Sequence, residues 1–315
     1  MAMSENPTVT IVVATYNRSE VLKHAIRSVL SSTFTNWELI VVGDGCTDDT
    51  EACVRSFVDS RIQFINLPRN TGGQAAPNNR GIELARGRYI AFLNHDDLFL
   101  DHHLGTCVGE LDAGGTDVVC APAIVAQEVR VDAPPPDRWR FFMTGVSGRP
   151  EYTPFAFYSA SSWMFRRELV STIGPWPAED SVFVTPSQAW LFRAWRSGAR
   201  LQFNGKIGVV LLDGGARRGC YAKRESPEHD KITHWMSEEP RAIEIMIENA
   251  AINTAQAAMD RAFHSPFKAL QRAVAYPVYS LLTAIGTHPL SLNMALRYGK
   301  RGGFVSRHRR VTGAR

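Results

Sequence analysis

Cysteine is scarce in this chain of 315 residues, and its five copies are scattered. They lie at Cys46, Cys53, Cys107, Cys120 and Cys220, an odd number without any CxxC spacing. This pattern argues against a zinc site and against a disulfide framework, and it favours a reducing compartment. We therefore expect the protein to be cytoplasmic.

Long apolar runs are missing as well. No stretch of about 18 apolar residues occurs, so we expect no membrane-spanning helix. The first residues, MAMSENPTVT, have neither the basic start nor the apolar core of a signal peptide, so we expect none. The content of 44% hydrophobic and 21% charged residues is ordinary for a globular protein.

Acidic residues are absent from Arg261 to the C-terminus, a stretch that carries ten Lys and Arg. The first 260 residues consequently have a net charge of −6, against +4 for the whole chain. Such asymmetry is typical of contact with a polyanion or an anionic membrane. No nucleic-acid motif accompanies the charge, so we expect no nucleic-acid partner. Basic residues at 300–301 and 307–310 follow an apolar helical segment, which suits peripheral attachment to the inner face of a membrane; a solvated tail is the other interpretation, and both stay open.

Strand-like and helix-like segments alternate through the first hundred residues. Runs rich in β-branched and apolar residues predict strands over residues 8–14, 37–42, 61–67 and 89–93. Apolar residues at helical spacing predict helices from residue 20, from residue 47 and over residues 79–86. This order favours an α/β fold with a mostly parallel sheet that helices flank.

The pattern loosens after residue 102. We expect strands over 118–123, 161–165 and within 200–212, helices over 166–173 and 188–197, and a proline-rich surface loop over 132–137. Beyond residue 217 the sequence predicts helices, including an apolar face over 241–260 and an apolar stretch over 269–285. We therefore divide the chain into a domain over 1–216, with halves 1–105 and 106–216, and a basic helical extension over 217–315.

Polar side chains follow three of the predicted strands. Thr15 and Tyr16 follow the first strand, Asp44 the second, and Asp96 and Asp97 the fourth. The carboxyl ends of parallel strands meet at one edge, where open α/β sheets bind their ligands. Two adjacent carboxylates repel each other, so they need a cation between them or solvent around them. The pair therefore indicates either a metal site or a solvated turn.

The ordered motifs of this half resemble those of family 2 glycosyltransferases, which have the GT-A fold. The resemblance rests on TIVVATYNRSEVLKHAIRSVLSSTFTNWELIVVGDGCTDDT, NTGG and NRGIELARGRYIAFLNHDDLF. It extends more loosely through SSWMFRRELVSTIGPW and WLFRAWRSGARL to about residue 212. The resemblance implies an inverting, metal-dependent enzyme that moves a sugar from a nucleoside diphosphate to a hydroxyl acceptor, such as the glycan of a growing surface polysaccharide.

The resemblance also implies roles for the residues that bind the nucleotide. The loop Thr15-Tyr16-Asn17-Arg18 matches the family's loop against the base and ribose. Tyr16 either stacks on the base or covers the core. Asp44 matches a carboxylate that accepts a hydrogen bond from the base, which favours a UDP-sugar; a simple turn residue is the alternative.

Asp96 and Asp97 match the family's metal-binding carboxylates beside the diphosphate, with Asp97 the better candidate for the direct ligand. Negative charge grows on the diphosphate as the glycosidic bond breaks, and Mg²⁺ or Mn²⁺ neutralises it. Carboxylate oxygens suit such hard ions.

Three features depart from the family pattern. Two of them are single residues, Gly43 and Asn94, which stand where the family usually has acids. His95 lies between Asn94 and the metal-binding pair. His95 either contacts phosphate, neighbours the metal or lies on the rim, and we favour the rim. The third departure is Pro186-Ser187, where the family has a Glu-Asp pair that supplies the general base.

The nearest carboxylates to that position are Glu179 and Asp180. Asp180 is our candidate for the base, and a solvated loop acid is the alternative. Ser187 and Gln188 either bind the acceptor or cap the following helix. The tryptophans nearby either form a platform for the acceptor sugar or, as helical spacing favours, belong to the core; they are Trp176, Trp190 and Trp195.

Two other functions stay open at this stage. A nucleotide-sugar-binding protein that has lost its base is favoured by Pro186-Ser187. A nucleotidyltransferase would also place a metal at the sheet edge, but it fits the order of the motifs less well. The sequence does not reveal the sugar, the acceptor, the linkage or the oligomeric state.

Overall fold

The computed structural model describes residues 6–146, 151–154, 156–212, 219, 226–263 and 276–312. Its strands are β1 (Val9–Thr15), β2 (Trp37–Gly43), β3 (Ile62–Asn66), β4 (Tyr89–Phe92), β5 (Asp97–Phe99), β6 (Val118–Cys120), β7 (Ala123–Glu128), β8 (Trp139–Thr144), β9 (Trp163–Arg166), β10 (Leu201–Phe203) and β11 (Val209–Leu212). Its labelled α-helices are α1 (Ser19–Leu30), α2 (Thr50–Arg55), α3 (Ala75–Leu84), α4 (His103–Asp112), α5 (Leu169–Ile173), α6 (Pro186–Arg196), α8 (Pro227–Glu238), α9 (Ala242–Phe263), α11 (Leu290–Tyr298) and α12 (Gly303–Thr312). Residues 276–284 are helical as well.

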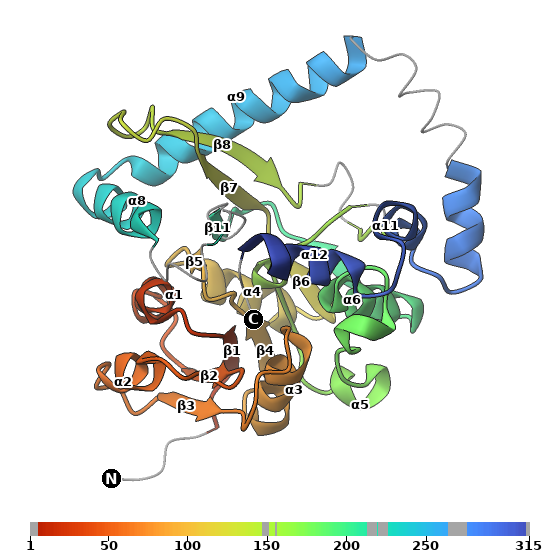
Figure 1. The fold of residues 1–315 in the computed structure, drawn as a ribbon, viewed down its shortest axis with the longest axis horizontal. Helices are drawn as coiled ribbons and strands as arrows, with labels where there is room; N and C mark the ends of the chain where they lie inside the picture. Colours follow the sequence, from red (N-terminus) through yellow and green to blue (C-terminus); the bar gives the residue numbers. More distant parts are fainter. Residues whose placement is uncertain are drawn as a thin grey trace.

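The central sheet of the described chain has seven strands in the order β10-β6-β9-β4-β1-β2-β3 (Figure 1). Strand β1 pairs in parallel with β2 and β4, and β2 pairs in parallel with β3. Only β9 runs antiparallel, between β4 and β6. The predicted α/β fold with a mostly parallel sheet is thus confirmed.

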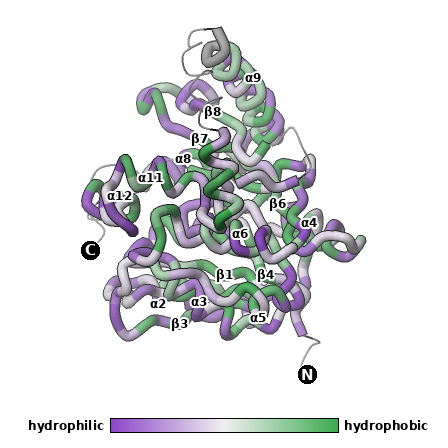
Figure 2. Tube along the Cα trace, turned by 90° about the vertical axis from the view of Figure 1, so that its right-hand side faces the viewer, coloured by the Kyte–Doolittle hydropathy of each residue, from purple (hydrophilic) through white to green (hydrophobic). Residues whose placement is uncertain are grey.

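Successive residues of β1 enter two different cores. Val9, Ile11 and Val13 pack against α1, α2 and α4, whereas Val12 packs on the other face with α3, α5 and α6. A strand that is buried on both faces needs apolar side chains at every position, which explains the continuous β-branched run. The interior strands β1 and β4 are accordingly green in Figure 2.

A smaller sheet, in the order β5-β11-β7-β8, lies beside the central one. Its apolar residues share a core with Ile232 of α8 and with Met246 and Ala250 of α9. The basic extension therefore packs against the smaller sheet instead of standing apart from it (Figure 1). The domain boundary at residue 216 stays a prediction.

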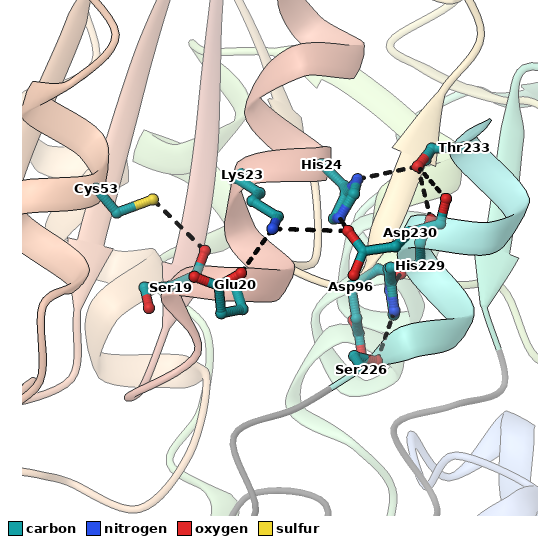
Figure 3. Close-up of polar contacts among 10 residues, drawn as sticks. All are labelled: Ser19, Glu20, Lys23, His24, Cys53, Asp96, Ser226, His229, Asp230 and Thr233. Carbon is teal, nitrogen blue, oxygen red and sulfur yellow. Dashed lines mark hydrogen bonds and ion pairs between the residues drawn. The ribbon is translucent and has the colours of Figure 1, made fainter. Parts of the chain in front are cut away.

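Helix α8 also docks on α1 through polar contacts (Figure 3). His24 Nε2 lies 3.0 Å from Asp230 Oδ1, and His24 Nδ1 lies 3.1 Å from the Thr233 hydroxyl. Burial and, next, the neighbouring His229 lower the pKa of His24 to about 4. The ring is therefore neutral near pH 7, and its contact with Asp230 is a hydrogen bond rather than an ion pair.

The structure differs from the sequence-based elements at several ends. The helix predicted over 79–86 already begins at Ala75, and the one predicted over 166–173 begins only at Leu169, because β9 continues to Arg166. The short strands β5, β7 and β8 were not predicted. Residues 217–218, 220–225, 264–275 and 313–315 of the predicted helical extension lie outside the described residues. None of the described helices combines the length and the apolar character that crossing a membrane requires.

The hypothesis of a tryptophan platform is wrong for two of its three members. Trp163 and Trp190 are fully buried and stack with ring centroids 5.5 Å apart, and Trp176 is buried beside them. These rings fill the core between the sheet and α6, so Trp176 and Trp190 are not available to an acceptor sugar. Trp195 is half-buried at the edge of the same core.

Candidate functional site

A pocket of about 260 Å³ lies at the carboxyl ends of β1, β2 and β4. Thr15 and Tyr16 line it from the end of β1, Asp44 from the end of β2, and His95 from the loop after β4. Of the side chains expected to converge at this edge, Thr15, Tyr16 and Asp44 line the pocket, whereas Asp96 and Asp97 are not among its described lining residues. We call this cavity the strand-end pocket.

The loop that follows β1 is held by Asn17. Its Oδ1 accepts a hydrogen bond of 2.8 Å from the amide of Thr47, in the loop after β2. Asn17 has a φ of 50°, a left-handed value that asparagine tolerates better than most residues. Within the described chain the buried Thr15 Oγ1 has no hydrogen-bond partner, so it is available to a ligand.

Asp44 holds a second loop against the pocket. Its Oδ1 accepts hydrogen bonds from the amide and the hydroxyl of Thr71, and its Oδ2 accepts one from the amide of Gly72, at 2.9, 2.7 and 3.0 Å. Residues 70–73 are thereby fixed at the pocket wall. A carboxylate has four acceptor positions, so these contacts leave room for a bond from a base. Base recognition by Asp44 stays a prediction.

Asp96 is surrounded by groups of positive or potentially positive charge. Burial alone would raise the pKa of its carboxyl, but His95, His229 and Arg18 together hold that pKa below the usual range. His229 Nε2 donates a 2.9 Å hydrogen bond to the backbone oxygen of Asp96, and His229 Nδ1 lies 2.7 Å from the Ser226 hydroxyl (Figure 3). The extension thus reaches the carboxylate pair through α8.

Asp97 is buried in β5 and has different neighbours. Its Oδ2 accepts hydrogen bonds from the hydroxyl of Ser161 and from Asn94 Nδ2, the latter at 2.8 Å. Burial and then the charge of Asp96 raise the pKa of Asp97 to about 8. Of two adjacent buried carboxylates, one commonly retains a proton in this way. The assignment of Asp97 as the direct metal ligand stays a prediction.

The residues present fit a hard divalent ion in their chemistry. Among the described residues no cluster of three His, Cys, Asp or Glu side chains surrounds a common point. However, Mg²⁺ is commonly held by one or two carboxylates together with substrate phosphates and water. Asp96 and Asp97 supply such a pair of carboxylates, and the raised pKa of Asp97 reflects its burial beside the charge of Asp96.

His95 is more buried than a rim residue. Only 6% of its surface is exposed, and its Nδ1 lies 3.2 Å from the carbonyl oxygen of Ala14. Burial lowers its pKa. The favoured rim position is therefore wrong, because the ring forms part of the pocket floor.

Glu179, rather than Asp180, lines the strand-end pocket. Its Oε1 accepts a 2.8 Å hydrogen bond from the amide of Ala75 at the start of α3. Asp180 lines a neighbouring cavity of about 540 Å³, which Glu179 also borders. The sequence placed both acids in one loop but did not show which of them lines the strand-end pocket.

The start of α6 is capped by Thr185, whose hydroxyl accepts a hydrogen bond from the amide of Gln188. The buried side chain of Gln188 donates to the backbone oxygen of Tyr158. This contact gives Gln188 a structural role. Pro186 lines the strand-end pocket, at the position where an acid was expected.

Sequence reasoning missed one wall of the pocket. It is formed by α12, in the basic tail, through Phe304, Val305, His308 and Arg309. The available signal was the concentration of basic residues without any acid, which the sequence analysis connected with a membrane.

Comparison with known proteins gives a family and several relatives. The model of the family described as glycosyl transferase family 2 matches residues 10–174. The chain is 38% identical over 117 residues to the succinoglycan biosynthesis protein ExoO of Rhizobium meliloti, covering 37% of this chain and 33% of that protein. It is 38% identical over 96 residues to the UDP-Glc:alpha-D-GlcNAc-diphosphoundecaprenol beta-1,3-glucosyltransferase WfgD of Escherichia coli, covering 30% of this chain and 38% of that protein. The matches therefore span little more than a third of these relatives.

Among solved structures, the fold is similar to that of TarS from S. aureus in complex with UDP-GlcNAc. The TM-score is 0.52 at 20% sequence identity, over 65% of this chain and 58% of that one. TarS in complex with UDP covers 82% of this chain with a TM-score of 0.51. This likeness supports the GT-A fold.

The raised pKa of Asp97 predicts a pH-dependent stability. Between about pH 4 and pH 8 the folded protein holds a proton on Asp97 that the unfolded chain has lost, so this group's contribution to stability falls as the pH rises. Asp97→Asn removes the carboxyl group that takes up this proton. In buffer with a chelator, we expect the free energy of unfolding of wild type to fall more steeply from pH 5 to pH 8 than that of Asp97→Asn.

The exposed carboxylate of Asp101 provides the control, because Asp101→Asn should keep the wild-type pH slope. Denaturant unfolding at several pH values measures all three proteins. Parallel profiles for wild type and Asp97→Asn would show that Asp97 is ionised in the folded protein.

Proposed function

Because the chain belongs to glycosyl transferase family 2, we propose that it transfers a sugar, with inversion, from a nucleoside diphosphate to a hydroxyl of a glycan or other acceptor. The observation that carries the proposal is the strand-end pocket, which brings Tyr16, Asp44 and His95 together at the edge where parallel sheets bind nucleotides. The buried, unpartnered Thr15 Oγ1 adds a polar atom that a ligand would satisfy.

We favour a UDP-sugar as the donor. The ring of Tyr16 offers a face for the base, and Asp44 retains acceptor capacity for an imino N–H. TarS was solved with UDP-GlcNAc, and the name of the E. coli relative specifies UDP-Glc. These names support uridine as the nucleoside of the donor, and they do not identify its sugar.

Asp96 and Asp97 would hold Mg²⁺ or Mn²⁺ beside the diphosphate. Such an ion, when bound, neutralises the charge that develops on the leaving diphosphate. Arg18 is almost fully buried, and its positive charge acts on Asp96. This arrangement keeps the Asp96 carboxylate ionised and therefore ready to bind a cation.

An inverting transfer also requires a base for the acceptor hydroxyl. Asp180 was the candidate from the sequence, and Glu179 lies nearer to the strand-end pocket. Both border the neighbouring cavity, which is open to an acceptor. We propose that the general base is the carboxylate of Glu179 or of Asp180.

The acceptor we favour is a growing surface polysaccharide, because relatives such as ExoO are named for polysaccharide synthesis. A protein that binds a nucleotide sugar without transferring it is the second candidate. The observation in its favour is Pro186 in the pocket wall, where relatives of this family place an acid.

We further propose that the protein works in the cytoplasm, attached to the inner face of a membrane through its extension. Tyr276, Leu281, Ile285 and Leu296 are more than 60% exposed there, and exposed basic residues lie beside them. Figure 2 shows hydrophobic and hydrophilic segments alternating along α11 and α12. Exposed apolar residues beside positive charge suit an anionic bilayer surface.

Calorimetric titration tests the sugar donor. We expect UDP to bind more tightly than ADP, CDP or GDP, and to bind better with Mn²⁺ than with a chelator. Asp96→Asn and Asp97→Asn should each weaken Mn²⁺-dependent UDP binding by about tenfold or more, because each removes a charged ligand. Asp101→Asn, which changes an exposed carboxylate, should bind as wild type does. Failure of every diphosphate to bind would contradict the proposed function.

Substitution of Glu179 and of Asp180 tests the assignment of the general base. Either Glu179→Gln or Asp180→Asn should lower turnover by roughly 100-fold or more while leaving UDP affinity within about twofold, because a general base acts only in the chemical step. Donor hydrolysis or transfer, measured beside UDP affinity, separates the two effects. If both variants retain wild-type turnover, neither acid is the base.

Vesicle binding tests the membrane proposal. The full chain should bind anionic vesicles at low salt and neutral vesicles poorly. Arg297→Ala combined with Arg307→Ala should weaken anionic binding on the order of tenfold, because each basic residue near such a surface contributes about 1 kcal/mol. Arg55→Ala combined with Arg80→Ala removes the same charge elsewhere and serves as control. Equal binding by both double variants would place the contact on another surface.

A further inference from the structure

Helix α12 is a wall of the strand-end pocket, although it lies far outside the family match to residues 10–174. The four side chains that line the pocket are spaced so that they share one face of the helix; they are Phe304, Val305, His308 and Arg309. Figure 1 shows α12, in dark blue, crossing the middle of the molecule above the central strands. The end of the chain is thus part of the candidate site.

The start of α12 is anchored to the loop that carries Glu179. The amide of Gly302 donates a 2.8 Å hydrogen bond to the backbone oxygen of Val182. A Cβ at Gly302 would lie 3.0 Å from the backbone oxygen of Glu179, and φ is +66° there, so glycine permits this close approach. The Arg301 guanidinium lies 5.7 Å from the ring centre of Phe183. These contacts fix the end of α12 from which its pocket face extends.

The guanidinium of Arg309 lies directly against Gly72. A Cβ at Gly72 would overlap its Nη1, and Gly72 belongs to the loop that Asp44 holds. His308 lies one residue earlier and also lines the pocket. Arg309 thus lies beside the loop that Asp44 holds, in the same wall as His308. In the proposed function, the nucleotide base lies at Asp44 and the metal at Asp96, and the diphosphate follows the path between them.

A diphosphate on this path requires positive charge from the protein. The carboxylates of Asp44 and Glu179 both line the pocket, and among its described lining residues the arginine is Arg309. A guanidinium presents a planar set of N–H groups that matches phosphate oxygens. Arg309 therefore has both the position and the chemistry that binding of a diphosphate requires.

We propose that Arg309, with His308 beside it, binds the diphosphate of the sugar donor, so that α12 of the C-terminal extension completes the donor site. This inference rests on the proposed function, which names the ligand as a nucleoside diphosphate.

The test compares two neighbouring arginines in the full chain. Arg309→Ala should weaken UDP binding by about tenfold or more in calorimetry, because a charge-assisted hydrogen bond to phosphate is lost. Arg310→Ala removes the same charge from an exposed position outside the pocket, and it should bind UDP as wild type does. Arg309→Lys should restore part of the affinity, because the charge returns without the planar fork.

Uridine, which has no phosphate, separates a diphosphate contact from a general distortion of the site. Its binding, followed by saturation-transfer NMR, should be the same in Arg309→Ala and wild type. Equal UDP affinity in Arg309→Ala and Arg310→Ala would overturn the inference while leaving the proposed function intact. Tighter UDP binding by Arg309→Ala would overturn it too, since α12 would then obstruct the site. If wild type binds no UDP, the proposed function fails and the inference falls with it.

Hydrogen exchange supplies a second readout that needs no substitution. Saturating UDP should slow amide exchange in residues 303–312 of wild type more than the same concentration of uridine does, because contact with the diphosphate stabilises the helix. Exchange in 303–312 that is unchanged by UDP, in a protein that binds UDP, would contradict a role for α12 in donor binding.

Discussion

The central constraint in this structure is the burial of two adjacent carboxylates at the end of a strand. Asp96 and Asp97 repel each other, and removal from water raises the cost of charging both. The two carboxyl groups therefore have different environments and different pKa values. Asp96 faces Arg18 and two histidines, which keep it ionised, whereas Asp97 is enclosed by Ser161 and Asn94 and retains a proton. The divalent cation that we propose between them would compensate both charges and remove this asymmetry.

The extension contributes to this arrangement from two sides. Helix α8 brings His229 to the backbone of Asp96, and α12 closes the strand-end pocket. The family match ends at residue 174, yet His229 lies beside the carboxylate of Asp96. The first half of the chain therefore supplies the strand ends of the pocket, and the second half supplies part of their electrostatic environment. A description of the site from the family motifs alone would omit these contacts.

The sequence predicted the central fold well because the signal was local. A continuous apolar strand and its flanking helix repeat several times, and polar residues follow each strand, so Thr15, Asp44 and Asp96 were placed at one edge. The short strands β5 and β8 carry no comparable pattern, since three to six residues are too few for a period to appear. The pairing of Arg309 with Gly72 joins residues far apart in the chain, and no spacing rule predicts such a contact.

The basic tail shows why charge counts alone were insufficient. Ten positive residues without an acid indicate an anionic partner, but that pattern does not separate a bilayer from a diphosphate. In the folded chain the positive charges are divided: Arg309 lies in the pocket, while Arg307 and Arg310 are exposed. One helix therefore presents arginines to the strand-end pocket and to the outer surface. If the proposed membrane contact involves the outer arginines, it constrains the same helix that forms a wall of the pocket.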